Sequence, residues 1–120
     1  MQTRKVIAVL SDLMFTVKIQ DAAKRAGLEV AFVTSPDNAV AQARENPRLI
    51  ILDLNFAAAA PLDLIRKLKQ EDATAKIPLL AFVSHVEADL IQAARNNGCD
   101  KVIARSAFSQ NLRAILSELA

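Results

Sequence analysis

The sequence lacks features that several classes of protein require. A single cysteine in 120 residues excludes an internal disulfide, so we expect Cys99 to be a small buried residue in a reducing compartment. The chain has only one histidine, His85, which excludes a histidine-based metal cage, and we expect it in a surface loop. No apolar run approaches the ~20 residues of a membrane helix. The first strand-like segment is too short, and too soon followed by Asp12, to be a secretory signal. We therefore expect a soluble cytoplasmic protein.

Glycine is also scarce, and the two glycines, Gly27 and Gly98, are both expected at helix ends. A flavodoxin-like enzyme or nucleotide binder needs a phosphate-binding loop of Gly, Ser or Thr after its first strand; with both glycines at helix ends, this class is not expected. The basic residues, with a net charge of +2, are scattered and never cluster with aromatics, so direct nucleic-acid binding is not expected. The 52% apolar content excludes disorder, and without a linker or repeat the chain is predicted to be one domain, 1–120.

The most informative stretch consists of four consecutive aliphatic residues, Leu49 to Leu52, followed directly by Asp53. So short a continuous apolar run predicts a strand that is buried on both faces. Ligands gather at the carboxyl ends of strands in an open parallel sheet, and a carboxylate there is costly to desolvate unless something uses or pairs it. We therefore interpret Asp53 as the centre of a site.

Strand-like and helix-like segments alternate along the whole chain. The predicted strands cover 5–10, 29–33, 49–54, 79–83 and 101–104. Helices are predicted after Asp12, from Ser35 with Pro36 at its first position, from Pro61, from Glu87, and from Ser109 as N-cap. Their predicted buried residues are Phe15, Ile19, Ala22, Ala23 and Ala26; Ala39, Val40 and Ala43; Leu62, Ile65 and Leu68; Leu90, Ile91 and Ala94; and Leu112, Ile115, Leu116 and Leu119.

Five strand–helix units predict an α/β fold with helices on both faces of a five-stranded parallel sheet. Right-handed crossovers favour the doubly wound, flavodoxin-like (βα)5 arrangement with strand order 2-1-3-4-5. In this order the ends of the first and third strands are neighbours, so Asp12 and Asp53 should face one crevice. Ser84 and Arg105, after the fourth and fifth strands, should join them.

The strand ends read Ser11-Asp12, Asp53, Ser84-His85 and Arg105-Ser106. With these residues the whole chain resembles a receiver domain of two-component signalling, similar to the chemotaxis response regulators. The family has an acidic pair, an aspartate, a Ser/Thr and a Lys-Pro at those places. The joins at 26–30, 76–78 and 97–100 are also similar to those of the family.

The resemblance implies that Asp53 accepts a phosphoryl group from a histidine kinase or another phosphodonor. It implies Mg²⁺ held by Asp12, Asp53 and the backbone carbonyl of Asn55, with a weak contribution from Ser11. Ser84 would donate to the phosphoryl oxygens, and Arg105 would stand in the place of the family's lysine. The face formed by helix 4, strand 5 and helix 5 would signal to a protein target, an effector domain or a second copy. The chain would not be an enzyme.

Several positions depart from the family. Ser11 removes one acid, which weakens Mg²⁺ binding, and Arg105 either clamps a phosphoryl group or pairs with Asp53 or Asp12. Val102 replaces the switch aromatic, and Ser106 replaces the proline. The alanines at 57–60 favour an early start of the third helix. The alternative is therefore a degenerate pseudo-receiver that binds proteins independently of phosphorylation. We expect either a stand-alone receiver or a piece of a longer protein.

Overall fold

Five parallel strands form one sheet in the order β2-β1-β3-β4-β5, which confirms the predicted fold class and strand order. The computed structural model describes residues 3–84 and 87–119. The strands are β1 (Lys5–Val9), β2 (Glu29–Val33), β3 (Leu49–Asp53), β4 (Leu79–Val83) and β5 (Lys101–Ala104). Every residue of β3 and β4 is buried, whereas the edge strands β2 and β5 are partly exposed. The strand predicted from a continuous apolar run, β3, is thus in the middle of the sheet.

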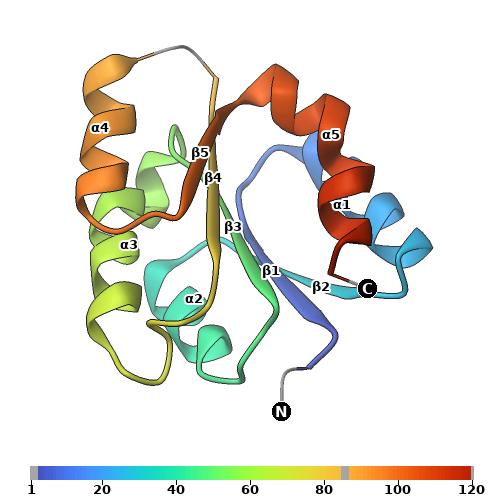
Figure 1. Ribbon diagram of the computed structural model, residues 1–120, viewed down its shortest axis with the longest axis horizontal. Helices are drawn as coiled ribbons and strands as arrows, with labels where there is room; N and C mark the ends of the chain where they lie inside the picture. The colour runs from blue at the N-terminus through green and yellow to red at the C-terminus, as the bar shows by residue number, and fades with distance from the viewer. Residues whose placement is uncertain (1–2, 85–86, 120) are drawn as a thin grey trace.

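Helices cover both faces of the sheet, and Figure 1 shows α2, α3 and α4 on one side with α1 and α5 on the other. The helices are α1 (Leu13–Arg25), α2 (Pro36–Ala43), α3 (Pro61–Gln70), α4 (Ala88–Asn96) and α5 (Arg105–Ser117), with a short 3-10 helix at Ala57–Ala59. Both glycines follow helices with positive φ, 73° at Gly27 and 105° at Gly98, as predicted. None of the described helices is long and apolar enough to cross a bilayer.

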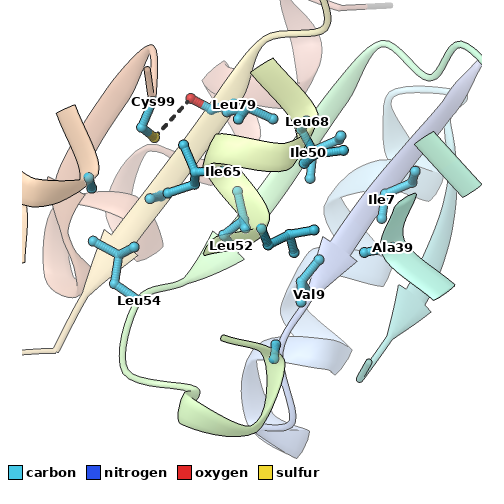
Figure 2. Close-up of a cluster of buried hydrophobic side chains, with 14 of the residues drawn as sticks. Ile7, Val9, Ala39, Ile50, Leu52, Leu54, Ile65, Leu68, Leu79 and Cys99 are labelled. Atoms are coloured by element: carbon cyan, nitrogen blue, oxygen red, sulfur yellow. Dashed lines mark hydrogen bonds between the residues drawn. The ribbon is translucent and has the colours of Figure 1, made fainter. Parts of the chain in front are cut away.

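The core beneath α2, α3 and α4 is aliphatic (Figure 2). Ile50 and Leu52 of β3 pack there with Ile65 and Leu68 of α3. Cys99 is buried at its margin, and its thiol donates to the carbonyl oxygen of Leu79 at 3.5 Å. Burial raises the pKa of the Cys99 thiol, so the prediction of a small buried residue is confirmed.

The core beneath α1 and α5 contains a cluster of three aromatic rings: Phe15 of α1, Phe82 of β4 and Phe108 of α5. The rings of Phe82 and Phe108 stack with centroids 4.8 Å apart, and Phe15 is tilted against both, at 5.3 Å and 5.8 Å. Phe82 and Phe108 are fully buried. This aromatic cluster joins two helices to the sheet directly beneath the edge where the candidate site residues lie.

Two predicted helix starts have different outcomes. Ser35 caps α2 by accepting from the amide of Asn38 at 3.2 Å, and Pro36 follows at the first position, as predicted. The prediction that Ser109 caps the last helix is wrong, because α5 begins at Arg105. The strand leads straight into this helix, whose N-cap, Ala104, has no side-chain hydrogen bond. Ser109 lies one turn inside the helix.

The helix faces were predicted with small errors. Of the predicted inward residues, Leu62, Leu90, Ile91, Ile115, Leu119, Ala26 and Val40 are only half-buried. The prediction missed two fully buried helix residues, Leu64 of α3 and Phe108 of α5. Helices on the outside of a sheet are covered on one stripe only, so the residues at the margins of that stripe remain partly accessible.

The alanine run does not extend α3, which corrects the expectation of an early helix start. Ala57–Ala59 forms a separate 3-10 turn, and Ala60 then adopts a left-handed conformation with φ 46° and ψ 61°. Pro61 begins α3 after it. The residue before a proline is sterically disfavoured in the right-handed helical region, which explains the interruption despite alanine's helix propensity.

We predict that Ala60→Gly raises the free energy of unfolding by about 0.5–1 kcal/mol, because glycine adopts a positive φ without the strain that a Cβ causes. Urea unfolding followed by far-UV circular dichroism measures the change. Ala58→Gly is the matched control, since Ala58 is exposed and has no positive φ, and it should lower stability. Equal effects of the two substitutions would contradict the strain at residue 60.

Candidate functional site

Asp53 is the last residue of β3, which lies between β1 and β4 in the sheet. Its exposed fraction is only 9%. One side-chain oxygen, Oδ1, accepts from the backbone amide of Asn55 at 2.9 Å. Burial raises the pKa of Asp53 above its ordinary value, and the charge of Asp12 raises it further, whereas the Asn55 hydrogen bond and the charge of Arg105 lower it. A buried carboxylate with only one hydrogen bond among the described residues is costly to keep ionised, so a further hydrogen-bond donor or a cation would stabilise it.

Asp12 lies at the end of β1 and caps α1, and both of its carboxylate oxygens have partners. Oδ1 accepts from the backbone amide of Phe15 at 3.1 Å, in ordinary N-cap geometry. Oδ2 pairs with Nη2 of Arg105. The hydrogen bond from Arg105 holds the pKa of the Asp12 carboxyl below its usual value, and the Phe15 amide adds to this effect. Both carboxylate oxygens of Asp12 are therefore engaged, whereas among the described residues Asp53 has a partner at only one oxygen.

Arg105 is the first residue of α5, and it is fixed from two directions. Its guanidinium pairs with Asp12 and also lies over the ring of Phe15, with Cζ 4.3 Å from the centroid. A cation over an aromatic face gains a further ~0.5–1 kcal/mol or more. Of the partners that the sequence left open, Arg105 thus pairs with Asp12, while its charge still acts on Asp53.

Ser84 and Asn55 join the ends of β3 and β4. The side-chain oxygen of Asn55 accepts a hydrogen bond from the backbone amide of Ser84 at 2.7 Å. The backbone amide of Asn55 donates a hydrogen bond to Oδ1 of Asp53. The carbonyl of Asn55, expected as a metal ligand, accepts from the amide of Ala57 at 3.1 Å. Asn55 therefore sets the position of Ser84 relative to Asp53. His85, expected in a surface loop, falls outside the described residues.

A groove of about 460 Å³ lies beside these residues, between α1 and α5. Phe15, Lys18, Ser84, Arg105 and Ser109 are among the residues that line it. Lys18 donates to the hydroxyl of Ser109 at 3.2 Å, which links the two helices across the groove. Both of the cations named here face a groove next to a buried acid, which makes its wall suitable for an anionic group.

The observed arrangement leaves no oxygen of Asp12 free for a divalent cation. Mg²⁺ needs an octahedron of oxygens, and both oxygens of Asp12 are already engaged. Ser11 is exposed. Within 3–84 and 87–119, no group of three or more His, Cys, Asp or Glu side chains is placed to hold a metal. A cation at Asp12 would first have to displace Arg105.

The structure thus links five of the six predicted site residues, Asp12 with Arg105 directly, Asn55 with Asp53 and Ser84 directly, and Asp53 with both charges through space. Ser11 stays outside this set. Their chemical roles remain predictions. Sequence reasoning missed Phe15 as the platform for Arg105 and the side chain of Asn55 as the brace of Ser84. The spacing of Asp53 and Asn55 was an available signal for their own hydrogen bond, because an aspartate side chain often accepts from the backbone amide two residues on, but it does not indicate the contact with Ser84.

The sequence matches no protein-family model and no curated protein. Solved structures do match. A response regulator from Hahella chejuensis superposes with a TM-score of 0.85 at 20% identity, covering 98% of this chain and 95% of that one. The chemotaxis response regulator CheY4 of Vibrio cholerae gives 0.80 at 18% identity, covering 97% and 98%. The Mn²⁺-bound form of the response regulator Rcp1 gives 0.77 at 16% identity, covering 98% and 91%. The chain therefore has the flavodoxin-like (βα)5 fold of response-regulator receiver domains.

Proposed function

We propose that the chain is a receiver domain of two-component signalling in which Asp53 accepts a phosphoryl group from a histidine kinase. The observation that carries the proposal is the placement of Asp53, a buried carboxylate at the carboxyl end of the central strand. Ser84 and Arg105 directly follow β4 and β5, the next two strands of the sheet, so they lie at the same carboxyl end of the sheet as Asp53. The fold shared with response regulators supports this choice.

The transfer needs few groups. An oxygen of the Asp53 carboxylate attacks phosphorus, the bond between phosphorus and the donor imidazole breaks, and the imidazole leaves with the electron pair. The product is an acyl phosphate on Asp53. Because donor and acceptor are both negative, the step needs positive charge close by, and Arg105 and Lys18 line the adjacent groove. The hydroxyl of Ser84 is a donor for the transferred oxygens.

The output of this domain would be binding rather than turnover. We propose that the face of α4, β5 and α5 contacts a protein target, an effector domain or a second copy, and that the domain acts in the cytoplasm without binding nucleic acid or membrane. β5 is an edge strand, so its open side is available. The added charge at Asp53 would reach this face through Ser84 at the end of β4 and Arg105 at the start of α5.

Incubation with acetyl phosphate tests the phosphoacceptor role. We expect intact mass spectrometry to show one added phosphoryl group on the native chain, sensitive to hydroxylamine, and none on Asp53→Asn. Asp63→Asn is the matched control, because Asp63 is an exposed aspartate of α3 and should not change the labelling. An unmodified native chain, or a label that survives in Asp53→Asn, contradicts the proposal.

The second candidate is a pseudo-receiver that binds its partner without phosphorylation. The standing ion pair between Asp12 and Arg105 favours it, because it already satisfies one of the acids that the chemistry would use. Ser11 and Val102 favour it as well, since each replaces a residue of the family's site or switch. A folded native chain that acetyl phosphate leaves unmodified, with and without Mg²⁺, would select this candidate.

A further inference from the structure

The arginine at the candidate site holds the position of a counter-ion. We infer that Arg105 is the resident cation of this site and that it competes with divalent cations for Asp12. The inference rests on the proposed function only in treating Asp12 and Asp53 as one site. It explains why an acidic site can be stable with the carboxylate of Asp12 ionised.

The first support is the state of the Asp12 carboxylate. Oδ1 is held by the amide of Phe15 at 3.1 Å and Oδ2 by Arg105, so neither oxygen is free of a protein donor. A divalent cation at Asp12 would have to remove the guanidinium from Oδ2 and would also face its positive charge. Cation entry and arginine release are therefore one event.

The second support is that Arg105 is held in place independently of Asp12. Its backbone begins a helix of 13 residues, and its guanidinium lies 4.3 Å from the centroid of Phe15. Phe15 is itself fixed by Phe82 and Phe108. An arginine held this way meets Asp12 with little entropy left to lose, so the pair competes more strongly than one between two flexible surface chains.

The third support is that of the two cations that line the groove, Arg105 and Lys18, only Arg105 pairs with Asp12. Lys18 lines the same groove, yet it donates to the hydroxyl of Ser109 and forms no ion pair with Asp12. Lys18 also lies over the ring of Phe15, at 5.7 Å. The two cations therefore share a groove and an aromatic ring, and differ in whether they occupy the carboxylate. This difference makes Lys18 the matched control.

Titration with Mg²⁺, followed by calorimetry and by amide chemical shifts around residues 12 and 53, tests the competition at about 0.15 M salt, where distant surface charges are largely screened. We expect Arg105→Gln to bind Mg²⁺ at least tenfold more tightly than the native chain, and Lys18→Gln to change the dissociation constant by less than about twofold. Arg105→Lys should lie between them, since it keeps the charge but loses the planar fork. Circular dichroism checks that each variant is folded, and Arg105→Ala repeats the test without the polar head group.

Adding Asp12→Asn to Arg105→Gln should remove the gain, because the acid for which the two cations compete is then absent. Equal gains in Arg105→Gln and Lys18→Gln, no gain in Arg105→Gln, or a gain that persists without Asp12 would each overturn the inference. The titration needs no phosphodonor. Failure of Asp53 to become phosphorylated would therefore end the proposed function while leaving this result readable, and the reverse also holds.

Discussion

Phe82→Ala should lower the free energy of unfolding by about 3–5 kcal/mol, the usual range for removing a fully buried phenylalanine. Phe82 contacts both other rings of the aromatic cluster, stacked on Phe108 at 4.8 Å and tilted against Phe15 at 5.3 Å. Alanine would leave a cavity that two rigid rings cannot close, because β4 is tied to β3 and β5 on both sides. Phe82→Leu, which conserves most of the volume, should lose far less.

The control for this prediction is Phe56→Ala. Phe56 is only half-buried and packs against the aliphatic core on the opposite side of the sheet, so its loss leaves a smaller cavity. The chain has neither tryptophan nor tyrosine, so unfolding in urea is best followed by far-UV circular dichroism. A domain of this size is expected to unfold in one transition. If Phe82→Ala lost no more stability than Phe56→Ala, the central role of the aromatic cluster would be refuted.

The aromatic cluster also connects the core to the candidate site. Phe82 is the register partner of Asp53 in the pairing of β3 with β4, and Phe15 supports the guanidinium of Arg105. The position of the cation therefore depends on the packing of rings below it. A change in that packing would be transmitted to the Asp12 pair without any direct contact with the acid.

The fold was predictable because its signals are local and agree with one another. The uninterrupted aliphatic run before Asp53 can be buried only in the centre of a parallel sheet, and Ser35-Pro36 satisfies a helix start by itself. Ser109 gave the same kind of signal, but the prediction was wrong. β5 ends at Ala104 and α5 begins at Arg105, so there is no loop between them in which a capping residue could lie. The αL conformation of Ala60 was hidden by alanine's helix propensity, which the following proline overrides.

The sequence predicted which residues lie at the candidate site, but not which of them pair with one another. Strand order alone brings Asp12, Asp53, Ser84 and Arg105 to one edge. Which acid Arg105 takes depends on the ring of Phe15, which holds the guanidinium beside Asp12, and helical spacing identified that phenylalanine only as a core residue. Long side chains choose partners by three-dimensional packing, which periodicity does not contain.

Asp53→Asn should raise the free energy of unfolding at neutral pH, by an amount on the order of 1 kcal/mol. The carboxylate of Asp53 is buried, and only its Oδ1 is hydrogen-bonded within the described residues. Asparagine keeps an oxygen that can accept from the amide of Asn55, and it removes the buried charge and its repulsion with Asp12. The residue that we assign to chemistry is thus expected to be suboptimal for stability, as functional residues often are.

The effect should depend on pH in a defined direction. Burial raises the pKa of Asp53 in the folded chain above its ordinary value of 3.8, which the unfolded chain keeps. Between these two pKa values the folded state holds a proton that the unfolded state has released, so stability falls as the pH rises through this interval. Above it the native chain carries the full penalty, and below 3.8 both states are protonated. The advantage of Asp53→Asn should therefore grow as the pH rises above 3.8 and disappear at acidic pH.

Asp12→Asn provides a control of opposite sign. The pKa of Asp12 is lowered in the folded chain, first by the hydrogen bond from Arg105, so its ionised form stabilises the fold at neutral pH and that contribution is lost on acidification. Unfolding in urea between pH 3 and pH 8 separates the two acids. We expect Asp53→Asn to gain and Asp12→Asn to lose stability at the upper end, with both differences shrinking towards the lower end. A loss of stability in Asp53→Asn at neutral pH would mean that the carboxylate has a stabilising partner, and would contradict the unpaired, buried acid on which the phosphoacceptor proposal stands.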